Sequence, residues 1–313
     1  NINTAMLEIK NLKKTQKGSQ SKNNAEKRNL EPKSLGNYET YIKDMGEYYV
    51  DEGSATSIYS KSHETTVVKI ETENGIIGWG EAQSPVSPNT TATIIKDIVE
   101  PLTIGKDIYD VESIWHNNYS SKRERGHYTG FYIDAICGVD IAIWDAIGKS
   151  QNMPTCKAMG GAHRKSVALY NGIGGTEPEE VADQAEWSVS KGYKFVKMHL
   201  KENLEKDIEI ARKVRERVGD SIGIMIDVHM GFDTFNVIKL GKELEKLNLL
   251  WIESPSDPTD IPGLCEISRA LDIPIANGEW TRTKYEMREI FEKRAYDISM
   301  PDIARTGLTG GKQ

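Results

Sequence analysis

The chain has 313 residues, of which 38% are hydrophobic, enough for one large domain or for a large and a small one. A net charge of −7 and an isoelectric point near 5.6 argue against nucleic acid as the main partner. No apolar run approaches the roughly 20 residues of a membrane span, and no signal-peptide pattern opens the chain. Cys137, Cys156 and Cys265 lie far apart, which indicates reduced thiols, so we expect a cytoplasmic protein without a membrane partner.

The composition of the chain changes near residue 64. Residues 17–37 are almost entirely polar, which predicts a flexible loop or tail after a short strand at residues 6–9. Ordered structure is expected from Glu64 onward. There, two β-rich runs flank Asn74-Gly75, a dipeptide with a strong preference for tight hairpin turns, so the segment predicts a β-hairpin.

Three helical patterns follow, at residues 89–102, 110–120 and 132–150. The third carries a wide stripe of isoleucine, valine and tryptophan, as a buried helix requires. We therefore predict an α+β domain over residues 1–163, in which about residues 11–53 are atypical, polar and flexible.

From Lys165 the pattern changes to alternating strands and helices, which is typical of a parallel sheet covered by helices and gives an α/β fold class. Six strands are too few to close an ordinary β/α barrel. We expect residues 164–313 to form an incomplete barrel, and the chain to be a truncated version of a longer one. The predicted strands are 167–170, 195–199, 223–229, 249–253, 273–278 and 297–300, and the predicted helices include 203–218 and 232–247.

Three acidic residues, Asp227, Glu253 and Glu279, end consecutive predicted strands at equal intervals of 26 residues. Each alone could be a helix cap or an ion-pair partner. The carboxyl ends of neighbouring parallel strands meet at one rim of a β/α barrel, so the three carboxylates should converge there. Crowded carboxylates repel one another unless a cation holds them, and oxygen ligands suit a hard ion. The spacing therefore predicts a Mg²⁺ site.

Six short motifs stand out between residues 77 and 302. They are Ile-Gly-Trp-Gly-Glu at 77–81, Gly-Val-Asp-Ile-Ala-Ile-Trp-Asp at 138–145, Gly-Tyr-Lys-Phe-Val-Lys-Met-His at 192–199, Trp-Ile-Glu-Ser-Pro at 251–255, Gly-Glu at 278–279 and Met-Pro-Asp at 300–302. Together they make residues 64–313 resemble the enolase superfamily, in its mandelate racemase-like branch.

The resemblance implies a mobile α+β capping domain over a modified barrel, with one Mg²⁺ held by three carboxylates. It also implies abstraction of a proton next to a substrate carboxylate. Such a proton is a very weak acid, because its removal leaves a second negative charge on the substrate. A divalent cation bound to the substrate carboxylate stabilises that charge most in the transition state.

Lys197 is the leading candidate for the base. Residues two apart in a strand share a face, so Lys197 and His199 should point into the barrel, while Val196 and Met198 face the helices. A lysine has an ordinary pKa near 10.4 and needs a lower value to act as a base near neutrality. A neighbouring Mg²⁺ and a cationic His199 would lower it.

Three further residues are candidates for catalysis. His199 stands where many relatives carry a second lysine, so it could tune Lys197, bind the substrate carboxylate or shuttle protons. His229 shares the inward parity of Asp227, and Asp-x-His resembles sugar-acid dehydratases in which this histidine protonates a departing hydroxyl; a structural histidine is the alternative. Asp302 matches an aspartate that orients a catalytic histidine on a seventh strand, which lies beyond the end of the chain.

These residues and the resemblance predict a lyase, a Mg²⁺-dependent dehydratase. It would convert an aldonate or aldarate to a 2-keto-3-deoxy acid. Two alternatives stay open. One is a racemase or epimerase of a 2-hydroxy acid, and the other is a catalytically inactive truncated member of the family. The expected partner is a small sugar-acid carboxylate, and we expect a homo-oligomer. The stereochemistry of the acid is not set by the sequence.

Overall fold

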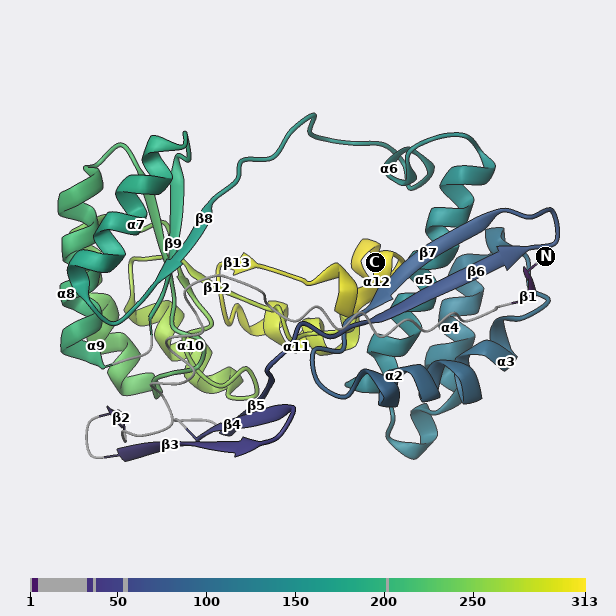
Figure 1. Cartoon of the computed structure of the whole chain (residues 1–313), viewed down its shortest axis with the longest axis horizontal. Helices are drawn as coiled ribbons and strands as arrows, with labels where there is room; N and C mark the ends of the chain where they lie inside the picture. Colours follow the sequence, from purple (N-terminus) through teal and green to yellow (C-terminus); the bar gives the residue numbers. More distant parts are fainter. Residues whose placement is uncertain (1, 5–32, 36–37, 53–55, 201–202) are drawn as a thin grey trace.

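The computed structural model describes residues 2–4, 33–35, 38–52, 56–200 and 203–313. It has two lobes, one built on a three-stranded sheet and one on a six-stranded parallel sheet (Figure 1). An extended connection after the short helix α6 (Thr155–Ala158) runs from the first lobe to the second. In the described part of the chain, none of the helices is long and apolar enough to cross a membrane.

The first lobe is the predicted capping domain. Its sheet has the order β1-β6-β7, and the predicted hairpin joins β6 to β7. The long helix α5 lies directly on β7, because a Cβ atom on Gly78 or Gly80 would overlap carbonyl oxygens of that helix. The elements are β1 (Ile2–Thr4), β6 (Thr66–Thr72), β7 (Ile77–Ala82), α2 (Pro88–Ile94), the π-helical turn η1 (Ile95–Val99), α3 (Glu100–Thr103), α4 (Val111–Ser121) and α5 (Phe131–Ser150).

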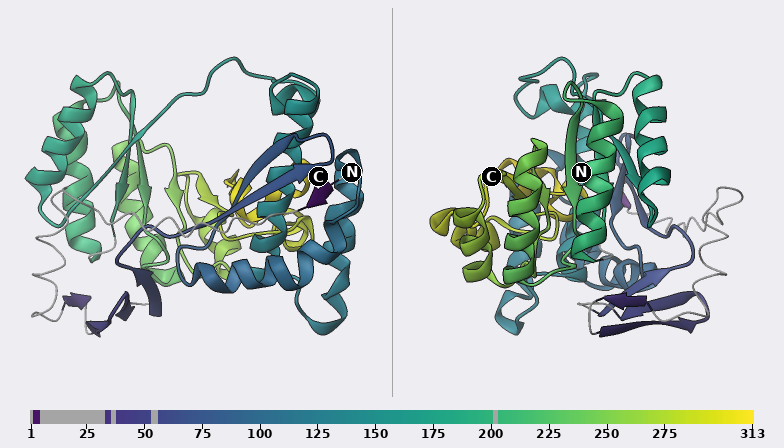
Figure 2. Two further views of the ribbon diagram at one scale, coloured as in Figure 1. Left: turned by 45° about the vertical axis from the view of Figure 1, so that its right-hand side comes forward. Right: turned by 90° about the vertical axis from the view of Figure 1, so that its left-hand side faces the viewer.

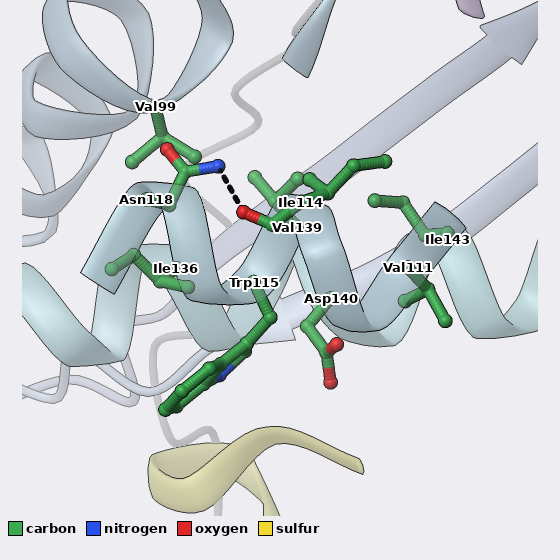
Figure 3. A pocket seen from close by; sticks show the side chains of 9 residues that line it. All are labelled: Val99, Val111, Ile114, Trp115, Asn118, Ile136, Val139, Asp140 and Ile143. Atoms are coloured by element: carbon green, nitrogen blue, oxygen red, sulfur yellow. Dashed lines mark hydrogen bonds between the residues drawn. The ribbon is translucent and has the colours of Figure 1, made fainter. Parts of the chain in front are cut away.

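Apolar side chains from these helices and strands form the core of the capping domain. Figure 3 shows part of it, a small cavity between α4 and α5 that is lined mostly by valine and isoleucine. Three polar side chains also line it: Trp115, Asn118 and Asp140. The side-chain amide of Asn118 donates a hydrogen bond to the backbone oxygen of Ile114 at 3.0 Å.

A four-stranded antiparallel sheet precedes the hairpin, so the expectation that order begins near Glu64 is wrong. The flexible region predicted at about 11–53 is likewise wrong for the strands of this sheet, where tyrosine, valine and isoleucine favour β-structure. The predicted strand at 6–9 and most of segment 17–37 lie outside the described residues. The strands are β2 (Lys33–Leu35), β3 (Tyr38–Met45), β4 (Tyr48–Glu52) and β5 (Thr56–Ser60).

The second lobe confirms the predicted α/β architecture. Its six strands pair in parallel in chain order, β8 to β13, and helices cover them (Figures 1 and 2). The elements are β8 (Asn171–Gly174), α7 (Pro178–Ser190), β9 (Phe195–His199), α8 (Leu204–Val218), β10 (Gly223–Asp227), α9 (Thr234–Leu244), β11 (Ile252–Glu253), α10 (Ile261–Ala270), β12 (Ile275–Asn277), α11 (Lys284–Lys293), β13 (Ile298–Ser299) and α12 (Ile303–Lys312).

The sequence predicted the first barrel strand at residues 167–170, but the structure has no strand there. Val167 and Leu169 are 70% and 69% exposed in the connection between the lobes, and the strand follows at β8. Two glycines of β8 lie beside β9, where a Cβ on Gly174 would come within 3.2 Å of the backbone oxygen of His199. A glycine-rich segment therefore forms the strand, although its composition argues against one.

The last helix, α12, returns to the capping domain and packs on α5. The Trp144 indole donates to the Thr309 hydroxyl at 2.9 Å, and the buried Asp140 accepts from both the backbone and the hydroxyl of Thr309. Burial raises the pKa of Asp140 to about 6, although the Thr309 hydrogen bonds oppose the rise. Gly307 allows this approach, since it has a φ of 69° and its α-carbon lies close to the Asp140 carboxylate.

Candidate active site

Four neighbouring strands, β9 to β12, bring polar side chains to one rim of the parallel sheet. Asp227 at the end of β10 is the register partner of His199 on one side and of Glu253 on the other. Glu279 follows two residues after the end of β12, the next strand in the sheet. The ends of these strands therefore lie side by side, while the convergence of the three carboxylates on one ion stays a prediction.

Lys197 lies between two of these carboxylates. Its Nζ donates to both oxygens of Glu253 at 2.9 Å and lies 3.5 Å from Asp227 Oδ2. Lys197 is 6% exposed and Glu253 is 3% exposed, so this ion pair is buried. The expected parity holds, because Val196 and Met198 pack in the hydrophobic core beneath the helices.

The electrostatics of the rim follow from this ion pair. Burial opposes ionisation of Asp227, but the hydrogen bond from His199 and the charge of Lys197 hold its pKa below the ordinary value. Burial and the nearby charge of Asp227 raise the pKa of Glu279. For Lys197, burial lowers the pKa, yet the bonds to Glu253 outweigh it and the net shift is upward. The lowering expected for Lys197 depends on a bound Mg²⁺ and a cationic His199, and it stays a prediction.

The donor set at the rim fits a hard divalent cation. Three ionised carboxylates and one ammonium group leave two negative charges, which one divalent ion would balance. Burial is the main reason why the pKa of Glu279 is raised, and the nearby charges of Asp227 and Glu253 add to the rise. Across the described residues, however, no three His, Cys, Asp or Glu side chains are grouped closely enough to chelate an ion as they stand. Ligation by Asp227, Glu253 and Glu279 stays a prediction.

The two candidate histidines flank Asp227. His199 Nδ1 lies 3.3 Å from Asp227 Oδ2, and the His199 side chain is 54% exposed at the mouth of the barrel. His229 lies beyond β10, which ends earlier than predicted, and has a φ of 44°. Its backbone N–H donates to Asp227 Oδ1 at 2.9 Å, and its ring meets the Trp280 ring edge-on at 5.6 Å.

Tyr59 also belongs to this group, and sequence analysis did not find it. Its hydroxyl lies 3.3 Å from Nε2 of His229, although 170 residues separate the two in the chain. Tyr59 comes from β5 of the N-terminal sheet, in a region expected to precede the ordered structure. The β-favouring residues Thr56, Ile58 and Tyr59 were the available signal for a strand there.

Asp302 lies apart from the Lys197 cluster. It is the N-cap of α12 and accepts from the Ala304 N–H at 2.9 Å, while Arg305 Nε lies 3.7 Å from it. Asp302 therefore caps α12, and the orienting role expected for it stays a prediction.

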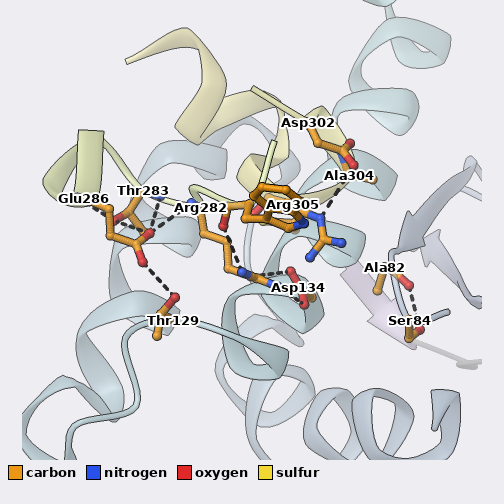
Figure 4. A network of polar contacts seen from close by, with 12 residues as sticks. Ala82, Ser84, Thr129, Asp134, Arg282, Thr283, Glu286, Asp302, Ala304 and Arg305 are labelled. Atoms are coloured by element: carbon orange, nitrogen blue, oxygen red, sulfur yellow. Dashed lines mark hydrogen bonds and ion pairs between the residues drawn. The ribbon is translucent and has the colours of Figure 1, made fainter. Parts of the chain in front are cut away.

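Close to Asp302, a buried bidentate ion pair joins the lobes (Figure 4). Arg282 donates from Nε to Asp134 Oδ1 at 2.8 Å and from a terminal nitrogen to Oδ2 at 3.1 Å. Asp134 belongs to α5, whereas Arg282 follows Glu279 and Trp280 and also donates to the Trp280 carbonyl. A second contact is made by the Thr129 hydroxyl, which donates to Glu286 at 2.8 Å. These contacts hold the Glu279 loop against the capping domain.

Comparison with known proteins agrees with this geometry. The N-terminal domain of mandelate racemase and muconate lactonizing enzymes matches residues 51–160, and the enolase C-terminal domain-like family matches residues 180–313. Arabinonate dehydratase from Saccharolobus solfataricus is 30% identical over 279 residues, which cover 85% of this chain and 74% of that enzyme. The N-succinyl-L-Arg/Lys racemase from Bacillus cereus is 31% identical and covers 74% of this chain and 62% of the racemase.

A solved structure of an enolase superfamily member from Agrobacterium tumefaciens is also similar. It has a TM-score of 0.79 and 26% identity, over 87% of this chain and 69% of that one. The capped parallel sheet and its acidic rim thus define an enolase superfamily fold. The chain belongs to the mandelate racemase/muconate lactonizing enzyme family. It spans between 54% and 74% of the length of six curated relatives.

Proposed function

We propose that the protein is a Mg²⁺-dependent dehydratase of a sugar acid, an aldonate or aldarate, which gives a 2-keto-3-deoxy acid. The proposal rests on one observation: two residues that can transfer protons, one with an amine and one with an imidazole, lie beside the same carboxylate. Lys197 and His229 both contact Asp227, one through its ammonium group and one through its backbone. Elimination of water needs such a pair, since one proton leaves the substrate and another joins the departing hydroxide.

In this proposal Asp227, Glu253 and Glu279 hold the metal, which supplies positive charge to the substrate carboxylate when bound. Lys197 takes the proton from the α-carbon as the neutral amine, after its bonds to Glu253 are released and one of its ammonium protons has passed to solvent. His229 donates a proton to the leaving hydroxyl at the β-carbon. His199, half-exposed and bonded to Asp227, orients the substrate at the mouth. The relatives named as dehydratases of arabinonate, talarate, galactonate and xylonate support this reaction class.

The deciding experiment is a screen of acid sugars in deuterated water with Mg²⁺. Formation of a 2-keto acid and exchange of the α-proton are measured together. We expect a keto acid from at least one aldonate or aldarate, and loss of both signals in Lys197→Met. Epimerised acid without keto acid would instead favour the racemase alternative, which the similarity to the racemase keeps in view. Exchange at the wild-type rate in Lys197→Met would assign the base to another group.

A further inference from the structure

The N-terminal four-stranded sheet reaches the candidate site through one side chain. The Tyr59 hydroxyl of β5 lies 3.3 Å from Nε2 of His229, and the ring of Trp280 meets the same imidazole edge-on. The imidazole is therefore bounded by a residue of the sheet and a residue of the barrel, while its backbone is tied to Asp227. Its positive φ places it outside the regular strand, where the ladder of β10 does not fix the ring.

We propose that Tyr59 is a positioning residue for His229, which holds the imidazole in the orientation needed to protonate the departing hydroxyl. This inference rests on the proposed dehydratase function. A tyrosine hydroxyl both donates and accepts, so it can bond to Nε2 whether or not that nitrogen carries a proton. Tyr59 can therefore hold the imidazole of His229 both before and after the proton is transferred. A hydrogen bond to one ring nitrogen also selects the tautomer, and so the nitrogen that carries the transferable proton.

The sheet holds Tyr59 in place for this task. The Tyr59 ring stacks on Tyr49 with centroids 5.5 Å apart, and the two residues are register partners across β4 and β5. Tyr48 anchors the sheet to the capping domain, because its hydroxyl donates to Glu64 and accepts from the Ser87 N–H. A side chain fixed by stacking and strand pairing loses little entropy when it bonds to a partner.

The test uses Tyr59→Phe, which deletes the hydroxyl and keeps the stacked ring. In deuterated water with Mg²⁺ and an active acid sugar, we expect dehydration to fall about 10- to 100-fold, while α-proton exchange stays within about twofold of wild type. His229→Asn should give the same separation, and adding Tyr59→Phe to it should cause little further loss, because both act on one step. Tyr109→Phe is the matched control; it removes an exposed hydroxyl that bonds to Ser150 in the capping domain, away from the four-stranded sheet, and should change neither exchange nor dehydration.

Equal loss of exchange and dehydration in Tyr59→Phe, or no loss of either, would overturn the proposal. If the wild-type chain dehydrates none of the acids, the proposed function is contradicted. The positioning role of Tyr59 is then tested separately, by ¹⁵N NMR of the His229 ring. The ring nitrogen signals should shift in Tyr59→Phe and stay in place in Tyr109→Phe. Unchanged signals in Tyr59→Phe would rule out the role.

Discussion

At the scale of single residues, the buried ion pair of Lys197 and Glu253 contributes most to the energetics of the rim. Each group has been removed from water, so each depends on the other for compensation of its charge. Loss of one partner of such a pair costs far more than the pair itself contributes, because a bare charge stays buried.

We therefore predict that Lys197→Met lowers the free energy of unfolding of the metal-free protein by about 3–5 kcal/mol at pH 8. If the three carboxylates bind Mg²⁺, the ion replaces the missing ammonium as counter-charge, and saturating Mg²⁺ should stabilise the variant more than the wild type. Urea unfolding with and without Mg²⁺ measures both effects. Lys293→Met, which breaks an exposed pair with Glu289, is the control and should change stability little. Equal stabilisation of variant and wild type by Mg²⁺ would contradict ligation by these carboxylates.

At the scale of elements, the contact between α5 and α12 makes the stability of the fold depend on pH. Asp140 is buried between the two helices, with Thr309 as its donor, and its pKa is raised from 3.8 to about 6. The folded state thus holds the proton more tightly than the unfolded state. The stability from this group is fully present below about pH 4 and is lost as the pH rises through about 6.

Asp140→Asn should remove this dependence. Between pH 4.5 and 7.5, we expect the stability of the wild type relative to Asp140→Asn to fall by about 2 kcal/mol. Chemical unfolding of both proteins across this range gives the difference directly, because the other carboxylates cancel in the comparison. Parallel stability curves for the two proteins would show that Asp140 does not titrate in this window.

For the whole molecule, the sequence pattern was sufficient to predict a β-hairpin followed by helices and then an alternation of strands and helices in a parallel sheet. Strand alternation predicted the faces of Lys197 and Val196, and strand order brought Asp227 beside Glu253. Local sequence patterns did not predict the residues that come to the site from distant parts of the chain. Tyr59 and the Asp134–Arg282 pair depend on contacts between segments more than 140 residues apart. The sequence also placed the first barrel strand too early, because exposed apolar residues in the connection imitate a strand.

The return of α12 to the capping domain has a consequence for the covalent connection between the lobes. The connection at 161–170 is exposed throughout and contains Arg164 and Lys165, which are trypsin sites. Trp144, Asp140 and Asp134 of α5 bond to residues that follow the connection. The two halves therefore hold each other without the intervening peptide, as in a split protein whose fragments complement one another. Brief trypsin treatment should cut this connection, and the fragments from its two sides, which separate on a denaturing gel, should still elute together in size-exclusion chromatography. Separate elution would mean that the peptide connection, and not α12, keeps the lobes together.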